Sequence, residues 1–115
     1  MAGGLRVARG GDRFHVYLTA LDPVRGSEIA KTRPCVVVSP NEINQEVRTV
    51  IVVPMTSTRE RYRFRIRSYF GDREGDLAIE QLRTIDRSRL IRRLGTLDET
   101  ISRELCAALV AMFRF

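Results

Sequence analysis

Short runs of β-branched residues, separated by proline, glycine and polar loops, dominate this sequence and leave room for only one substantial helix. The runs predict strands over residues 15–21, 35–38, 47–53 and 77–80, with Pro54 ending the third of them. A short helical turn is expected at 41–45, and a short helix followed by a final strand over 88–94. Because no strand–helix–strand unit repeats, the pattern predicts a small antiparallel sheet or barrel.

The last segment is predicted to be a helix that begins near residue 98. Asp98 can cap it, or Thr96 and Glu99 can form a capping box. Apolar residues then recur at helical spacing, at Leu97, Ile101, Leu105, Ala108, Leu109 and Met112. This stripe is expected to bury against the sheet rather than to form a dimer contact. The fold class is therefore α+β, mainly β, of the size of an SH3-like barrel with a C-terminal helix packed on the sheet.

Arginines alternate with aromatic and apolar residues between Arg61 and Arg67. A period of two is typical of a strand and places the arginines on one face and Tyr62, Phe64 and Ile66 on the other. Two interpretations remain open. The arginines form either the solvated outer face of an amphipathic strand or a track that binds phosphates.

The composition indicates one basic domain. The chain has 115 residues and a formal net charge of +6, and Lys31 is its single lysine, so arginine supplies nearly all the positive charge. Arginine pairs with phosphate through two hydrogen bonds, which favours nucleic acid or an acidic protein as partner. Residues 1–12 contain half of the eight glycines and are expected to form a flexible arm, followed by a single domain over 13–115.

The few cysteine and histidine residues do not suggest a metal site. Cys35 and Cys106 lie in apolar runs without metal-ligand spacing, and the single histidine, His15, is distant from both in sequence. We expect buried free thiols, no cofactor and a reducing, cytoplasmic location. No apolar stretch approaches the length of a membrane span.

Four sequence blocks follow one another along the chain. They are Leu21-Asp22-Pro23-Val24-Arg25-Gly26-Ser27-Glu28 with Lys31-Thr32-Arg33-Pro34, then Val36-Val37-Val38-Ser39-Pro40, then Val52-Val53-Pro54-Met55-Thr56-Ser57, and Glu80-Gln81-Leu82-Arg83-Thr84-Ile85-Asp86. In this order and at this spacing they resemble the signatures of the MazF/PemK toxin family, and the resemblance extends from about Arg13 onward.

The resemblance implies a function that the composition alone does not specify. Members of this family are toxins of bacterial type II toxin–antitoxin pairs, with an SH3-like barrel and a homodimeric assembly. They cut single-stranded RNA, including mRNA, at selected sequences and so inhibit translation and growth. A MazE-like antitoxin blocks the RNA groove. These properties are expectations for this chain.

RNA can be cleaved without a metal ion when its own 2′-hydroxyl attacks the adjacent phosphorus, leaving a 2′,3′-cyclic phosphate and a 5′-hydroxyl. A scheme with two histidines is excluded because the chain has one. By resemblance, Arg33 and Thr56 occupy the two central catalytic positions, where they would bind the charged phosphate. Arginine is a poor base, so Glu28 is the favoured general base, with Glu80 as the alternative and a structural role open for either.

The resemblance also suggests RNA contacts at Ser27, Lys31, Ser57, Arg61 and Gln81. The Gln81 amide can either read a base edge or hold a loop. Asp86 can cap the short helix after it, and Arg83 can pair with a carboxylate. Some relatives carry an arginine and an aspartate where Ala78 and Glu80 stand here, so Arg33 is expected to supply that missing charge.

Two other functions remain to be tested. A non-catalytic toxin of the CcdB type, which has a similar fold and binds DNA gyrase, would use C-terminal residues such as Phe113 and Phe115. A basic RNA-binding domain without activity would use the arginines between residues 61 and 67. The Arg33, Thr56 and Gln81 blocks favour the nuclease.

Overall fold

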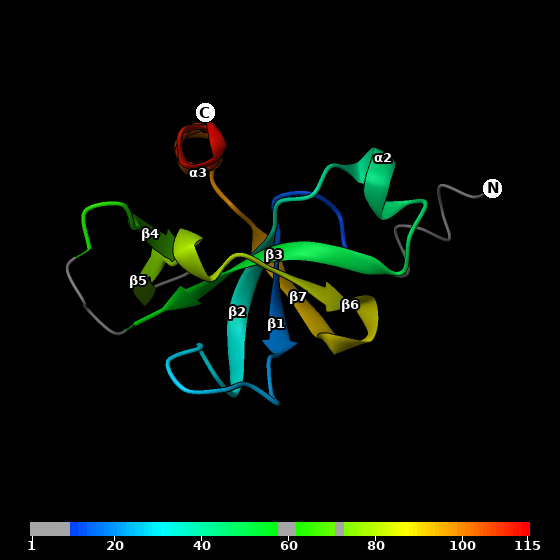
Figure 1. The fold of residues 1–115 in the computed structure, drawn as a ribbon. Coiled ribbons are helices and arrows are strands. Elements are labelled where there is room, and N and C mark those ends of the chain that lie inside the picture. Colours follow the sequence, from blue (N-terminus) through cyan, green and yellow to red (C-terminus); the bar gives the residue numbers. More distant parts are fainter. Residues whose placement is uncertain (1–9, 58–61, 71–72) are drawn as a thin grey trace.

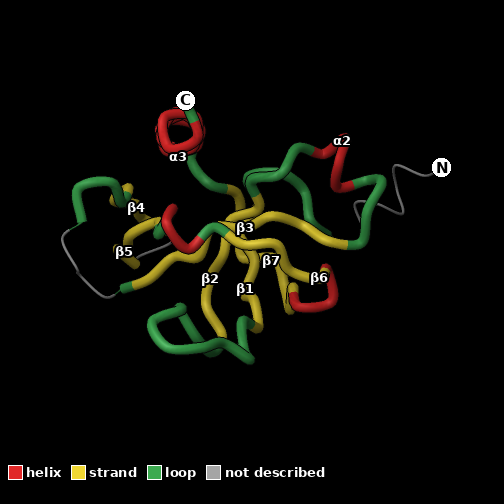
Figure 2. The backbone as a smooth tube through the Cα atoms, in the orientation of Figure 1, coloured by secondary structure: helices red, strands yellow, loops and turns green. Residues whose placement is uncertain are grey.

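The computed structural model describes residues 10–57, 62–70 and 73–115, which form strands, short helical turns and one long helix (Figure 1). The strands are β1 (His15–Ala20), β2 (Thr32–Val37), β3 (Thr49–Thr56), β4 (Ile66–Phe70), β5 (Arg73–Leu77), β6 (Arg83–Asp86) and β7 (Leu90–Thr96). The helices are α2 (Asn41–Asn44), α3 (Glu99–Phe113) and the 3-10 turns η1 (Ile79–Gln81) and η2 (Arg87–Arg89). Figure 2 shows a long loop without regular secondary structure between β1 and β2.

The described strands form one curled antiparallel sheet. They pair in the order β4–β5–β3–β2–β1–β7, and β6 pairs with β3. Strand β3 changes partner along its length: its first half pairs with β6, its middle with β2, and Met55 and Thr56 with β5. Figure 1 shows β3 crossing the middle of the molecule between these partners. The end of β3 is thereby placed beside both β5 and η1.

Buried side chains lie on both faces of the sheet. One cluster, which includes residues of α3, contains Val16, Val36, Val38, Val53, Met55, Leu77, Ile79, Leu97 and Leu105. The other contains Tyr17, Leu21, Cys35, Val37, Val50, Val52 and Ile85. Sequence neighbours on a strand fall into different clusters because successive side chains point to opposite faces. Each fully buried aliphatic side chain contributes about 1.5–3 kcal/mol, so both clusters hold the curled sheet together.

Helix α3 begins directly after Asp98. The Asp98 carboxylate accepts hydrogen bonds from the backbone N–H groups of Thr100 at 3.0 Å and Ile101 at 3.2 Å. The Thr96 hydroxyl accepts a hydrogen bond from Arg93 instead. Of the two caps that the sequence allows, the structure therefore has the Asp98 cap.

The apolar stripe of α3 is buried only in the first part of the helix. Leu105 is fully buried, whereas Met112 is 41% exposed and Phe113 is 70% exposed. The expectation that the whole stripe packs against the sheet is therefore wrong for the last turn of the helix. None of the helices within the described residues is long and apolar enough to span a membrane.

Strand β3 does not end at Pro54, contrary to the prediction, but continues to Thr56. Proline has no N–H to donate, yet its carbonyl still accepts a hydrogen bond from the N–H of Ala78 at 2.9 Å. Of the strand that was expected over 77–80, only Leu77 lies in a strand, where it is the last residue of β5. The 3-10 turn η1 follows from Ile79.

Of the strand expected over residues 61–67, only Ile66 and Arg67 lie in a strand, and the prediction is wrong for residues 62–65. Residues 62–65 form a turn, with a hydrogen bond from the N–H of Arg65 to the carbonyl of Tyr62, and β4 begins at Ile66. Tyr62 and Phe64 are 45% and 48% exposed, whereas the side chain of Arg65 is 6% exposed. Arg65 and the two aromatic residues thus reverse the expected pattern, whereas Arg63 and Arg67 are exposed as expected. Arg61 lies outside the described residues.

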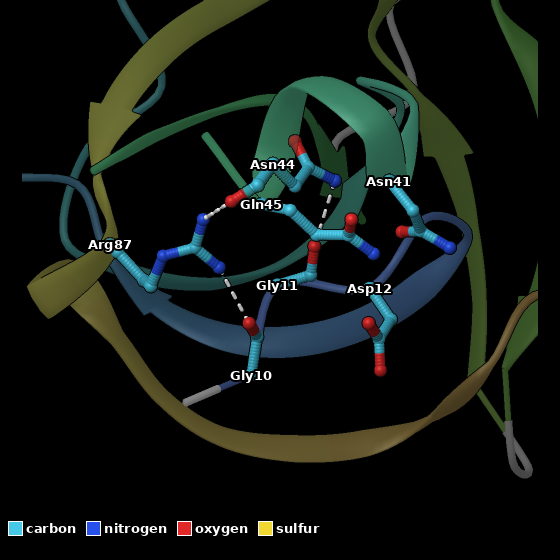
Figure 3. A pocket seen from close by; sticks show the side chains of 7 residues that line it. All are labelled: Gly10, Gly11, Asp12, Asn41, Asn44, Gln45 and Arg87. Atoms are coloured by element: carbon cyan, nitrogen blue, oxygen red, sulfur yellow. Dashed lines mark hydrogen bonds between the residues drawn. The ribbon is translucent and has the colours of Figure 1, made fainter. Parts of the chain in front are cut away.

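Arg87 ties the first described residues to α2. Its guanidinium donates to the carbonyls of Gly10 and Asn44, and the Asn44 amide donates to the carbonyl of Gly11 (Figure 3). Gly11 has a φ of +89°, and a Cβ there would lie 2.1 Å from Nη1 of Arg87. The hollow among these residues is about 10 Å³, the size of one water molecule. Residues 10–12 of the predicted arm thus contact the domain, and residues 1–9 lie outside the described residues.

Candidate active site

A pocket of about 250 Å³ forms where the β1–β2 loop, β2, β3 and η1 meet. It is lined by Ser27, Glu28, Ile29, Ala30, Arg33, Thr56, Arg65 and Gln81. All three predicted catalytic residues are among them, together with two of the predicted RNA contacts. Lys31 and Ser57 do not line the pocket, and Arg61 lies outside the described residues. The fold therefore brings together residues that are more than fifty positions apart in sequence.

Arg33 and Thr56 lie on strands, and pairing with neighbouring strands holds the backbone of each residue in place. Arg33 is the second residue of β2 and pairs with Thr19 of β1; its Nε donates to the carbonyl of Ala30 at 3.3 Å. This hydrogen bond does not engage the Nη groups of Arg33. Thr56 is buried at the end of β3, where β5 approaches closely: a Cβ on Gly75 would lie 3.0 Å from the carbonyl oxygen of Thr56.

Gln81 holds the β1–β2 loop against η1. Its side-chain oxygen accepts a hydrogen bond from the N–H of Ile29 at 2.9 Å, and its side-chain nitrogen donates to the carbonyl of Ser27 at 3.2 Å. Both ends of the amide are engaged. Of the two roles that the sequence left open, these contacts favour holding the loop over reading a base.

Glu28 and Lys31 are exposed residues of the same loop. A carboxylate oxygen of Glu28 accepts a hydrogen bond from the N–H of Arg25 at 2.7 Å. Lys31 has a positive φ of 68°, and its N–H donates to the Asp22 carboxylate at 3.0 Å. The local hydrogen bonds of Glu28 and Lys31 therefore shape the loop, and Glu28 also lines the pocket.

Arg65 is a pocket residue that sequence reasoning did not place there. Its Nε donates to both Glu80 oxygens, at 3.0 and 3.2 Å, and its Nη2 pairs with the same carboxylate. Its guanidinium lies 4.7 Å from the centre of the Tyr62 ring. Hydrogen bonding to Glu80 raises the pKa of Arg65 above its already high ordinary value. The only sequence signal was the arginine alternation, which suggested a strand whose arginines form either a solvated outer face or a phosphate-binding track.

Arg33 is thus not the only arginine beside Thr56. Ala78, which stands where some relatives carry an arginine, is fully buried in the chain. Arg65 reaches the pocket from the turn before β4 instead. The prediction that Arg33 must supply the missing charge alone did not anticipate this second guanidinium.

A second pocket of about 450 Å³ adjoins the first. It shares Ser27, Glu28 and Gln81 with the first pocket and adds Glu80, Leu82 and Arg83 to the lining. The guanidinium of Arg83 donates to the carbonyl of Leu21 at 3.3 Å. Together the two pockets extend along η1 and offer space for more than a single phosphate group.

Three other residues that the sequence pointed to do not line the candidate pocket: His15, Cys35 and Asp86. His15 accepts a hydrogen bond from Arg93 at 3.1 Å, and burial followed by the Arg93 charge lowers its pKa. Burial raises the pKa of the Cys35 thiol to about 12. Asp86 caps η2 through the N–H of Ser88, as predicted. Within the described residues, no three His, Cys, Asp or Glu side chains are grouped so as to hold a metal ion.

A protein-family model for the PemK-like, MazF-like toxin of type II toxin–antitoxin systems matches residues 12–113. This chain belongs to that family. The match covers the four sequence blocks and every residue that lines the candidate pocket, so the resemblance predicted from the blocks is confirmed.

Solved structures of the PemK-like, MazF-like family share the fold. MazF from Deinococcus radiodurans superimposes with a TM-score of 0.80 at 24% identity, covering 90% of this chain and 96% of that one. An endoribonuclease in complex with its cognate antitoxin, from a mycobacterial species, gives a TM-score of 0.74 at 21% identity, with 89% and 93% covered. The Mycobacterium tuberculosis toxin MazF-mt6 gives 0.71 at 19% identity, with 86% and 95% covered.

These superpositions confirm the predicted fold class for this family member: a mainly β, curled antiparallel sheet with a C-terminal helix packed on it. Structures of MazE–MazF complexes from Deinococcus radiodurans also match, with TM-scores of 0.69 to 0.73. The same fold therefore occurs in complexes with an antitoxin.

Proposed function

We propose that this chain is the toxin of a type II toxin–antitoxin pair and cuts single-stranded RNA at selected sequences without a metal ion. Cleavage of mRNA in the cytoplasm would inhibit translation and growth. The observation that carries this proposal is that Arg33 and Thr56, which match the two central positions of the family, line one pocket. They come from different strands, and Gln81 fixes the loop beside them.

In the proposed reaction the 2′-oxygen of the RNA bonds to the adjacent phosphorus and the bond from phosphorus to the 5′-oxygen breaks. The products are a 2′,3′-cyclic phosphate and a 5′-hydroxyl. The 2′-hydroxyl proton passes to a base, and the departing 5′-oxygen takes up a proton. Arg33 stabilises the negative charge on the phosphate through its Nη groups, and Thr56 orients the phosphate.

Glu28 is the proposed base. It lines the pocket with Arg33 and is exposed, so it can exchange protons with water. Glu80, the alternative, is engaged by Arg65 through three hydrogen bonds. Both oxygens of Glu80 are therefore already bound to Arg65 and are less able to reach a 2′-hydroxyl.

The remaining proposed RNA contacts lie around this pocket. Ser27 lines it, Lys31 lies on the same loop, and Ser57 follows Thr56 directly. We propose that the backbone of this loop, which Gln81 holds in place, contributes to sequence selection. Arg61 belongs to the same proposed set.

A homodimer and an antitoxin complete the proposed assembly. Exposed apolar residues of α3 adjoin a groove of about 810 Å³, lined partly by Phe64, Ala108 and Met112, which suits a second copy of the chain. The net charge of +6 suits a MazE-like antitoxin whose acidic segment occupies the RNA groove.

The test is to incubate the purified protein with a long single-stranded RNA in excess EDTA and to map the product ends. Discrete cuts that leave a 2′,3′-cyclic phosphate and a 5′-hydroxyl are expected. Arg33→Ala should lower the rate by at least about 100-fold, the usual effect of losing one donor to a developing oxyanion. Arg92→Ala removes the same charge from an exposed position on β7 and is the matched control.

Unchanged cleavage by Arg33→Ala would overturn the assignment of Arg33. Intact RNA with a folded wild-type protein would overturn the nuclease and favour the second candidate, a protein-binding toxin of the CcdB type. Phe113 is 70% exposed and Phe115 is fully exposed at the chain end, which is the observation that favours this candidate. Capture of purified DNA gyrase, lost on deleting the last three residues, would support it.

A further inference from the structure

Arg65 lines both the candidate pocket and the groove of about 810 Å³, and it carries a buried positive charge with an unused donor. Its side chain is 6% exposed, and its Nε and Nη2 groups donate to Glu80. Nη1 is also buried and has no hydrogen-bond partner in the part of the chain that the structure describes. Buried donors in proteins are nearly always paired, and a charged donor without an acceptor destabilises the fold. An acceptor supplied by a ligand would satisfy Nη1.

Two contacts fix the orientation of this guanidinium before any ligand arrives. Glu80 holds one edge through Nε and Nη2, and the Tyr62 ring lies against its face at 4.7 Å. Because the group is held on two sides, little conformational entropy is lost when it binds an anion. Preorganised donors of this kind are more effective than those that must reorient.

The chemistry of the pocket indicates which acceptor suits Nη1. Arg65, Arg33 and Thr56 line the same space, and two guanidinium groups with a hydroxyl are donors suited to a phosphate. We propose that Arg65 donates Nη1 to a non-bridging oxygen of the RNA phosphate that Arg33 binds, and that Glu80 is a positioning residue for Arg65. This inference rests on the proposed function, because the RNA substrate supplies the phosphate.

The test uses Arg65→Ala, Arg65→Lys and Glu80→Gln, with Arg92→Ala as the control for loss of charge. Single-turnover cleavage is measured at a site mapped with the wild-type protein. Binding is measured against salt with a short fluorescent strand that carries 2′-deoxyribose at the attacked position. Each variant is also checked for its melting temperature.

We expect Arg65→Ala to slow cleavage by about 100-fold and to lower the slope of log affinity against log salt by about 0.7, the value for one phosphate contact on a single strand. Arg65→Lys keeps a charge to pair with Glu80 but has one nitrogen in place of three, so it should fold normally and still cut slowly. Glu80→Gln should reduce cleavage less than Arg65→Ala and leave the salt slope nearly unchanged.

A wild-type rate for the folded Arg65→Lys variant, or a salt slope for Arg65→Ala equal to that of Arg92→Ala, would overturn the inference. If the wild-type protein binds RNA without cutting it, the proposed function fails while the salt slopes, measured on an unmodified strand of mixed sequence, still decide the role of Arg65. If it does not bind RNA at all, both fail.

Discussion

The side chain of Gln81 connects two elements that line the candidate pocket. Its amide joins η1 to two backbone groups of the β1–β2 loop, at Ser27 and Ile29. The loop has no regular secondary structure (Figure 2), so such contacts limit its motion. Glu28 lies between Ser27 and Ile29 in the sequence, so its placement depends on these two contacts with Gln81.

Gln81→Ala is expected to loosen the loop. Each of the two hydrogen bonds contributes about 1 kcal/mol, so the amide of Ile29 should exchange with deuterated water faster, and RNA cleavage should slow by about tenfold. Hydrogen exchange followed by mass spectrometry checks the first effect. Gln45→Ala, at an exposed glutamine beside α2, is the control. Unchanged protection around residue 29 in Gln81→Ala would contradict this role.

Some residues of the candidate pocket could be predicted from local sequence patterns, and others could not. Arg33, Thr56 and Gln81 lie in blocks that resemble the family, so their positions along the chain identified them. Arg65 was read from its alternation alone, which predicted a strand. Its guanidinium pairs with Glu80, fifteen positions away, and no local periodicity encodes that pairing.

At the level of elements, the start of α3 could be predicted as a choice between two caps. The sequence allowed Asp98 alone or a box of Thr96 and Glu99, because both arrangements have the required spacing. The structure has the Asp98 cap, and the Thr96 hydroxyl instead accepts a hydrogen bond from Arg93 of the same strand, β7. The choice depended on a contact outside the helix.

Asp98→Ala should lower the free energy of unfolding by about 1 kcal/mol, because two N–H groups of the first turn of the helix lose their acceptor. Asp98→Asn keeps an acceptor oxygen and should cost much less. Urea denaturation of both variants checks this. A loss for Thr96→Ala equal to that for Asp98→Ala would indicate that Thr96 contributes to the cap after all.

Strand ends were the least predictable feature of the sheet. Proline was taken to end a strand, but the carbonyl of Pro54 accepts a hydrogen bond from Ala78, where β3 changes partner from β2 to β5. This extension carries Thr56 to the pocket. A tertiary contact thus overrides a local signal at the position on which the site depends.

At the scale of the molecule, the fold class followed from many short strands and one terminal helix. The exposed end of that helix did not follow, because helical periodicity marks an apolar stripe without showing how far the sheet extends beneath it. The sheet supports Leu105 but leaves Val110, Met112 and Phe113 exposed. Exposed apolar residues grouped on one element are typical of interaction surfaces, and we propose that these residues contact a second copy of the chain.

We expect Val110→Glu to convert the proposed homodimer to a monomer, because a carboxylate would be buried without a partner at the proposed interface. Size-exclusion chromatography with light scattering measures the mass, and circular dichroism confirms the fold. Thr100→Glu adds the same charge to the other end of α3 and should leave the dimer intact. A dimer that survives Val110→Glu would place the interface elsewhere.

The partners of β3 and β1 are spread along the whole chain. Strand β3 needs β5 and β6, and β1 needs β7, which ends at residue 96. A nascent chain leaving the ribosome therefore cannot complete the sheet, or close the pocket with Gln81, until most of its sequence has emerged. Premature termination before η1 would yield a chain with Arg33 and Thr56 but no assembled site. Translation itself thus delays the appearance of the assembled pocket until the residues of η1 have left the ribosome.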